Sequence, residues 1–341
     1  MSAVLTPPEA PATAPAGRFG GLLRAETHRF TARRFIQVLL GLAVLAWLGV
    51  LALGLVNFQA TTPERLAAAE SARQEQVDMS NSYREQCISS SDVPAGTSAD
   101  EFCGPVTVAD DLKLEWFLDP APFSLGGDGA NGAVAFSAAA SVLAFLVAGT
   151  YVGAEWSSRS MSALLFWETR RPRVMGAKIA VAGVAALLIG VVAQLSWLAM
   201  AGIWQARAGD GAALPDDFWS TLLGAQGRGV LLTVCAGLLG FGLTNLVRNT
   251  GAALGAGFVY FAVLESAVRA VAPAWQPWLL TNNAAALVTP GGLELYTGFD
   301  PITQESTKYL LGNLQAGIYM GVVTVLVVGL GVVLFSRRDV H

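Results

Sequence analysis

The chain has 341 residues, of which 53% are hydrophobic and only 13% are charged. An ordinary soluble domain is about 25% charged. This balance and a mean hydropathy of +0.51 therefore predict an integral membrane protein. A formal net charge of −4 gives no reason to expect nucleic acid as a partner. The three cysteines and two histidines form no CxxC or Cys/His cluster, which argues against a structural zinc site.

The chain begins with two segments of different character. Residues 1–17 are rich in Pro and Ala and lack an apolar stretch of signal-peptide length, so we expect a disordered cytoplasmic tail. Residues 18–34 carry five arginines, with Phe19, Leu22, Leu23 and Phe30 on one helical face. This pattern predicts an amphipathic interfacial helix on the cytoplasmic leaflet. A basic lead-in that only fixes the topology is the alternative.

Six apolar runs lie within residues 35–341, each about as long as the ~20 residues needed to cross a bilayer. They are Phe35–Val56, Ala133–Gly153, Val174–Ile203, Thr221–Val247, Gly251–Ala272 and Asn313–Phe335. Their content of Gly, Ala, Val and Leu suits close helix packing in lipid. The predicted fold class is therefore an all-α integral membrane protein with a six-helix transmembrane domain. Leu279–Val288 is too short to span and predicts a re-entrant or interfacial helix.

The distribution of Lys and Arg predicts the orientation in the membrane. Thirteen of the 21 basic residues fall on the side of the N-terminus, and the other eight are spread over longer segments on the opposite side. Both termini are therefore expected in the cytoplasm, in a multi-pass protein of the cell (plasma) membrane. The thirteen are Arg18, Arg24, Arg29, Arg33, Arg34, Arg159, Arg170, Arg171, Arg173, Lys178, Arg248, Arg337 and Arg338.

In this topology residues 57–132 form a long, acidic extracytoplasmic insert between the first and second spans. Residues 63–86 have a helical pattern, the rest is turn-rich, and Gly126–Ala130 is expected to be a turn. In an oxidising exterior, Cys87 and Cys103 would form a disulfide that closes this segment. Two free thiols are the alternative, expected if the topology were inverted.

Glu265 and Arg269 interrupt the fifth apolar run. An ionisable residue within a span is a functional hypothesis by default, here a polar latch or a substrate contact near the outer leaflet. An i, i+4 ion pair that neutralises itself on one helix face is the alternative. The chain has no Walker A, HExxH or G-x-S-x-G pattern. We therefore predict no catalytic residue, no cofactor-binding residue and no metal ligand.

Residues 154–178 form a short polar and basic segment between the second and third spans, on the cytoplasmic side. Ser157–Trp167 can form a short helix with Met161, Leu164 and Leu165 on one face. A basic run follows at residues 170–173 and ends this helix before the third span. A short helix parallel to the membrane is suited to dock into a cleft on a soluble partner. An ordinary positive-inside loop fits the physics equally well.

This segment resembles the intracellular loop of the type-2 ABC-transporter permease family. The family pattern runs roughly A-E-x-x-x-G-T-x-x-x-L-L-x-x-P-x-x-R-x-x-V-x-x-x-K. The ungapped matches are Ala154, Glu155, Leu164, Leu165, Arg171, Val174 and Lys178. The departures are Arg159 for Gly, Ser160 for Thr and Glu168 for Pro. The resemblance covers most of residues 18–340, but not the N-terminal tail or the insert between the first two spans.

The resemblance implies a membrane-spanning permease subunit of an ATP-driven ABC transporter, working as an exporter. Such permeases pair with a second permease protomer, as a homo- or heterodimer, and bind a separate ATPase subunit. ATP with Mg would then be held by that subunit, with no cofactor on this chain. The implied ATPase-coupling residues are Glu155, Arg159, Leu164, Leu165, Arg170, Arg171 and Lys178. The alternative function is a non-transporting membrane sensor or anchor with a ligand-reading extracellular loop.

Overall fold

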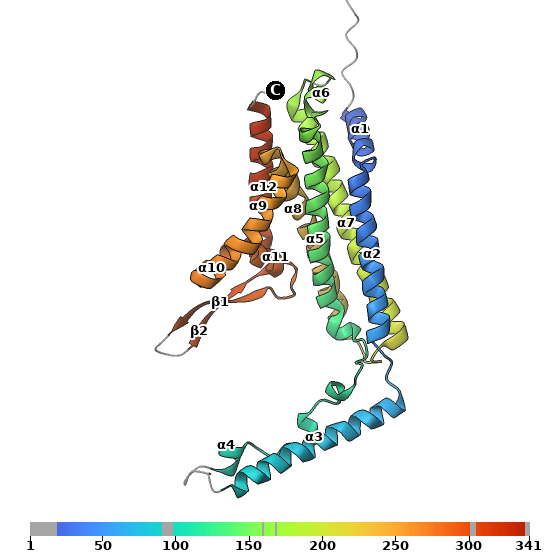
Figure 1. The fold of residues 1–341 in the computed structure, drawn as a ribbon, viewed down its shortest axis with the longest axis vertical. Helices are drawn as coiled ribbons and strands as arrows, with labels where there is room; N and C mark the ends of the chain where they lie inside the picture. The colour runs from blue at the N-terminus through green and yellow to red at the C-terminus, as the bar shows by residue number, and fades with distance from the viewer. Residues whose placement is uncertain (1–18, 91–97, 159, 168, 301–304, 338–341) are drawn as a thin grey trace, which may run out of the picture. The chain divides into compact units, whose positions relative to one another are not determined.

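The computed structural model describes residues 19–90, 98–158, 160–167, 169–300 and 305–337 (Figure 1). Most of its elements are helices. In chain order they are α1 (Phe19–Thr31), α2 (Arg34–Asn57), α3 (Pro63–Ser89), α4 (Ala99–Cys103), η1 (Ala109–Asp111), η2 (Leu114–Phe117), α5 (Leu125–Ser157), α6 (Ser160–Trp167), α7 (Arg171–Ala208), α8 (Phe218–Val247), α9 (Thr250–Val259), η3 (Tyr260–Leu264), α10 (Glu265–Val271), η4 (Pro273–Trp278), α11 (Leu280–Val288), β1 (Leu293–Asp300), β2 (Glu305–Leu311) and α12 (Asn313–Arg337).

Six of these helices are long and apolar enough to cross a membrane: α2, α5, α7, α8, the α9–α10 stretch Thr250–Val271, and α12. The chain is accordingly a multi-pass membrane protein. The α9–α10 stretch is interrupted by the π-helical turn η3, directly before Glu265. A π-turn shifts the side chains that follow it around the helix axis.

Several spans begin earlier than the sequence predicted, the second and third among them. The third span begins at Arg171 rather than at Val174, and Pro172 lies in its first turn, where its missing N–H group is not needed. The second span begins at Leu125, so residues 126–130 are helical rather than a turn. The glycines there are tolerated because they allow close packing. A Cβ added at Gly129 would lie 2.9 Å from the Phe218 ring.

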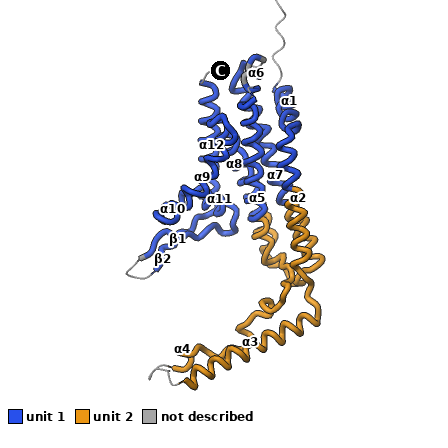
Figure 2. The backbone as a smooth tube through the Cα atoms, in the orientation of Figure 1, with its two compact units in different colours: residues 1–43, 134–194, 225–341 blue, residues 44–133, 195–224 orange. Residues whose placement is uncertain are grey.

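The structure divides into two compact units (Figure 2). Unit 1 comprises residues 1–43, 134–194 and 225–341, and unit 2 comprises residues 44–133 and 195–224. In unit 1, one apolar cluster is centred on α5 and α7 and includes Tyr151 and Met175. A second cluster joins α8, α11, α12 and the two strands, and includes Leu295 and Leu311.

Small residues bring α5 and α8 together within unit 1. A Cβ added at Gly240 would lie 2.4 Å from the backbone oxygen of Phe145. One added at Gly237 would lie 2.7 Å from the Cβ of Ala186 on α7. Residues without side chains allow helix backbones to approach closely, which is how helices pack in lipid.

The strands β1 and β2 form an antiparallel hairpin that the all-α prediction did not include. Gly291 and Gly292 precede it with φ of 79° and 98°, a backbone conformation that favours glycine. Leu295 and Leu311 are buried, whereas the other residues of β2 are exposed. The hairpin therefore depends on one buried face, supplied by packing against α11 and α12, which a short alternating sequence does not reveal.

The short helix α11 is held at both ends by side chains from other elements of unit 1. At its start, the Glu265 carboxylate accepts hydrogen bonds from the Thr281 backbone N–H (3.1 Å) and from the Thr281 hydroxyl. At its end, the Asn313 side-chain amide donates to the carbonyls of Ala286 (2.6 Å) and Leu287 (3.2 Å). Helix ends leave backbone groups without partners, and these bonds satisfy them.

Unit 2 contains an aromatic cluster and a disulfide. Phe123 packs edge-to-face against Phe58 and Trp204, with ring centroids 5.2 and 5.4 Å apart. Cys87 at the end of α3 is bonded to Cys103 at the end of α4, with their Cα atoms 5.8 Å apart. The disulfide closes the turn-rich segment that follows α3.

We predict that Gly240→Ala destabilises the fold by about 1–3 kcal/mol, because the added methyl meets the backbone of α5 rather than a movable side chain. Thermal unfolding in detergent would measure this loss. Gly321→Ala on α12 is the matched control, since nothing lies within 4 Å of its added Cβ. It should be neutral or stabilising by up to about 1 kcal/mol. Equal melting temperatures for the two variants would contradict the proposed close contact.

Candidate functional site

The short helix α6 lies between the end of α5 and the start of α7, as expected for residues 154–178. Its Met161 and Leu164 are buried in unit 1, at 1% and 8% exposure. Phe166 points outward and is 86% exposed. Arg159 lies outside the described residues, and Leu165 is described only as part of the α6 backbone. The helix thus has an inner face that anchors it and an outer face that presents an aromatic ring.

Next to α6, a buried lysine joins three helices. Lys178 on α7 is fully buried, and its Nζ lies 2.5 Å from Glu155 Oε2 on α5 and 2.7 Å from Glu26 Oε2 on α1. Both carboxylates are themselves buried, with Glu26 at 0% and Glu155 at 2% exposure. One ammonium group therefore bridges two carboxylates from helices far apart in the sequence.

Three further side chains complete this cluster. Arg33 Nη2 lies 3.1 Å from Glu155 Oε1, and Arg29 Nη1 lies 3.0 Å from Glu26 Oε1. The Tyr151 hydroxyl donates a hydrogen bond to Glu26 Oε2 at 2.6 Å. We call these six residues the ion network: Glu26, Arg29, Arg33, Tyr151, Glu155 and Lys178. Its two carboxylates face three cations, so the negative charges buried there are compensated.

Glu26 was not among the site residues predicted from the sequence, although the sequence carries a signal for it. It is the one acidic residue among the five arginines of residues 18–34. It also follows Leu23 by three positions and precedes Phe30 by four, on the apolar face of the helix. A carboxylate on an apolar face needs a buried cationic partner.

The apolar face of α1 consequently packs on protein. Leu23 and Phe30 lie against the α5–α7 cluster, and the rings of Phe30 and Tyr151 are 5.2 Å apart in an edge-to-face arrangement. The sequence predicted a helix whose apolar side enters the leaflet. Burial of Glu26 explains the difference, because its charge is compensated by Lys178 in the protein and would not be in lipid.

Glu155, Leu164 and Lys178, predicted as coupling residues, lie inside the subunit. Their side chains anchor α6 and its flanking helices, so any effect of theirs on a partner would be indirect. The sequence predicted a short helix with Met161, Leu164 and Leu165 on one face, suited to dock into a partner, and the structure buries Met161 and Leu164 within unit 1. The physical reason is that the apolar side of α6 is needed to attach the helix to α5 and α7.

A second set of contacts at the same end ties α5 to α8 and α12. The Trp156 indole N–H donates to Asn245 Oδ1 at 3.2 Å, and the Asn245 amide donates to the Gly331 carbonyl at 3.1 Å. The Arg248 guanidinium lies 4.5 Å from the Trp156 ring centroid, a cation–π contact. The end of α5 is therefore fastened on two sides.

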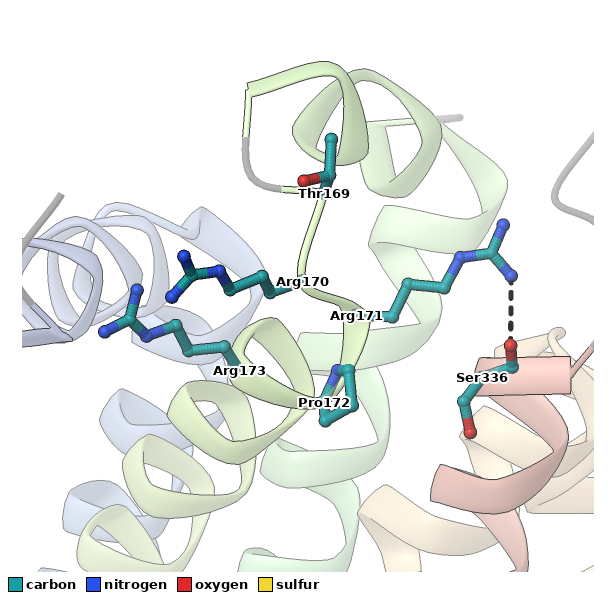
Figure 3. Close-up of a pocket in the computed structure, with 6 residues that line it drawn as sticks. All are labelled: Thr169, Arg170, Arg171, Pro172, Arg173 and Ser336. Carbon is teal, nitrogen blue, oxygen red and sulfur yellow. Dashed lines mark hydrogen bonds between the residues drawn. The ribbon is translucent and has the colours of Figure 1, made fainter. Parts of the chain in front are cut away.

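The basic run predicted at residues 170–173 lines an open hollow of about 680 Å³ beside the start of α7. Figure 3 shows Arg170 and Arg173 extending to one side and Arg171 to the other. Arg171 Nη1 donates to the Ser336 carbonyl at 3.3 Å, near the end of α12. Thr169 and Pro172 complete the lining.

The pair Glu265–Arg269 is also present, away from α6. Arg269 Nη2 lies 3.0 Å from Glu265 Oε2 and 3.1 Å from Asn282 Oδ1. Since Glu265 also accepts hydrogen bonds from Thr281, the pair fastens α10 to α11 and is more than an ion pair along one helix. A substrate contact there stays a prediction. Within the described ranges, no group of His, Cys, Asp or Glu is placed to hold a metal ion.

No family model, no curated protein and no solved structure matches this chain. Its function therefore has to be argued from the membrane spans, from α6 and from the ion network.

We predict that Lys178→Met destabilises the protein by about 3–5 kcal/mol, because two buried carboxylates lose their shared cation. Thermal unfolding of the purified protein would measure the loss. Adding Glu26→Gln to this variant should recover part of it, since one uncompensated charge is removed.

Lys308→Met serves as the control for removing a lysine. Lys308 pairs with Glu294 on the exposed hairpin, where both side chains are more than half exposed. Water screens such a pair, so its loss should leave the melting temperature nearly unchanged. A similar loss in both lysine variants would show that Lys178 has no special role.

Proposed function

We propose that this chain is the membrane-spanning permease subunit of an ATP-driven transporter, similar to the type-2 ABC-transporter permeases. A separate ATPase subunit would bind ATP with Mg and hydrolyse it, and this chain would supply neither a catalytic residue nor a cofactor site. The direction proposed is export, and the working unit is a dimer of permeases. Direction and dimer rest on the family resemblance alone.

The observation that carries the proposal is the arrangement of α6 above the ion network. An eight-residue helix connects two spans and presents Phe166, which is 86% exposed. An exposed aromatic ring on a short helix is suited to fill a pocket in a soluble partner. Directly inside, Glu155 and Lys178 join the same two spans to each other and to α1.

This arrangement supports a mechanical coupling. A push on α6 would be transmitted to the end of α5 and the start of α7, to which its buried side is attached. Separating Lys178 from its carboxylates would leave charges unpaired in a region of low dielectric constant, which is costly. The ends of α1, α5 and α7 would therefore move as one body, as in rigid-body switching.

In the proposed topology the protein lies in the plasma membrane. The helix α6, the start of α1 and the end of α12 are on its cytoplasmic side. The positive-inside rule supports this orientation, because Arg170, Arg171 and Arg173 flank α6. The disulfide Cys87–Cys103 would then lie in the oxidising exterior, where disulfides persist.

We predict that Phe166→Ala lowers retention of the ATPase subunit about tenfold, as expected when a central aromatic contact is truncated. The measurement is co-purification of an ATPase when the chain is expressed together with its neighbouring genes. Phe299→Ala is the control, because Phe299 is 60% exposed on the hairpin, at a distance from α6 in the sequence. If no ATPase is retained by the unaltered chain, the proposed function is wrong.

A sensor or anchor is the second candidate, favoured by the disulfide-closed part of unit 2. This part exposes several aromatic rings, with Tyr83 at 64%, Phe102 at 46% and Trp116 at 66%. Exposed aromatic side chains on a cross-linked element are suited to ligand recognition.

Removal of this element separates the two candidates. Gln59 N–H donates to the Ala121 carbonyl at 3.3 Å, so residues 62–118 can be replaced by a short Gly-Ser linker between neighbouring points. For a permease we expect unchanged ATPase retention and at most altered substrate specificity. Loss of every cellular response to an extracellular compound, with no ATPase retained by either protein, would favour the sensor.

A further inference from the structure

Three arginines gather within four residues at the start of α7. Arg170, Arg171 and Arg173 line the hollow of about 680 Å³ together with Thr169, Pro172 and Ser336 (Figure 3). The hollow is open, and it lies between the first turn of one spanning helix and the last turn of another. Arg170 and Arg173 therefore place two guanidinium groups on one side of the open hollow, and Arg171 lies on the other side, beside Ser336.

The position of the hollow along the spans decides which anion it meets. Arg173 is followed at once by Val174 and Met175, which begin the apolar run of α7. On the other side, Ser336 lies one residue before the end of α12, whose sequence is apolar up to Phe335. Both helices pass from apolar to polar residues at this level. Phospholipid phosphates lie at the corresponding depth of a bilayer, just outside the hydrocarbon.

The side chains suit a phosphate group. A guanidinium presents paired N–H donors in a planar fork that matches two phosphate oxygens, and these charge-assisted bonds are stronger than neutral ones. The start of the 38-residue helix α7 adds the positive end of its dipole. Basic pockets between spanning helices on the cytoplasmic side are a recognised way to hold an anionic headgroup.

We propose that this basic hollow binds the phosphate of an anionic phospholipid, such as phosphatidylglycerol, at the end of α7. The binding would attach the start of α7 to the membrane surface, beside α6. The proposal does not require the transport function. Carboxylates of a soluble partner could also pair with arginines, but the depth of the hollow at the ends of two spans favours a lipid headgroup.

Lipid titration of the full-length purified chain tests the proposal. Detergent-solubilised protein is titrated with phosphatidylglycerol, with phosphatidylcholine and with glycerol 3-phosphate, and bound lipid is counted by native mass spectrometry. We expect saturable binding of phosphatidylglycerol only. The double variant Arg170→Gln/Arg173→Gln should weaken it by about tenfold or more, the effect of losing two charge-assisted contacts.

The charge-matched control is Arg24→Gln/Arg34→Gln, which removes two exposed arginines of α1 and α2. It should leave the affinity for phosphatidylglycerol within about twofold, and an equal weakening would overturn the site in favour of general surface charge. Equal binding of phosphatidylcholine or glycerol 3-phosphate would overturn the lipid assignment. Unchanged lipid binding combined with loss of a co-purifying ATPase would assign the arginines to a protein contact. If the double variant does not fold, Arg170→Gln alone applies the same test.

Discussion

The buried contact of Lys178 with Glu26 and Glu155 is the interaction on which the packing of α1, α5 and α7 depends. Each of these three charges would be costly if it were buried alone. The two carboxylates compensate Lys178, and each carboxylate is in turn paired with Lys178 and with one arginine, Arg29 or Arg33. The requirement fixes α1 against α5 and α7, and it turns the apolar face of α1 toward protein. The short helix α6 does not have to hold its neighbours together, because the ion pair of Lys178 with Glu155 already joins α7 to α5.

The same physical requirement, that polar groups in apolar surroundings have partners, shapes the α11 region. There the groups to be satisfied are the ends of a nine-residue helix. The Glu265 carboxylate accepts a hydrogen bond from the Thr281 backbone N–H. The Asn313 side-chain amide donates hydrogen bonds to the carbonyls of Ala286 and Leu287. In lipid, backbone groups without partners are costly, so a helix too short to span needs such caps. The charged pair predicted within the fifth span is thus part of the architecture of this region.

These contacts divide the segment between α5 and α7 into parts with different roles. Buried side chains, including Leu164, attach the segment to the spans, and Phe166 is left to meet a partner. The basic residues that follow lie at the level where α7 leaves its apolar run, which is why a lipid headgroup suits them better than a deep protein cleft. In the proposed transporter, partner contact, force transmission and membrane attachment would therefore fall to neighbouring but separate residues.

Much of the fold could be read from the sequence, because hydropathy and helical periodicity are properties of consecutive residues. The six spans, α3, α6 and the pairing of Cys87 with Cys103 follow from such local patterns. The sequence located the candidate site in this way but did not show what each of its residues does. Glu26 and Lys178 are 152 residues apart, and no local pattern indicates that the Lys178 ammonium compensates the Glu26 carboxylate. Only tertiary packing decided that Glu155 and Lys178 are buried, that the hairpin has a buried face, and that α11 is capped by Glu265 and Asn313. The reason is that burial and charge compensation depend on which surfaces meet in space, and the chain order does not specify these.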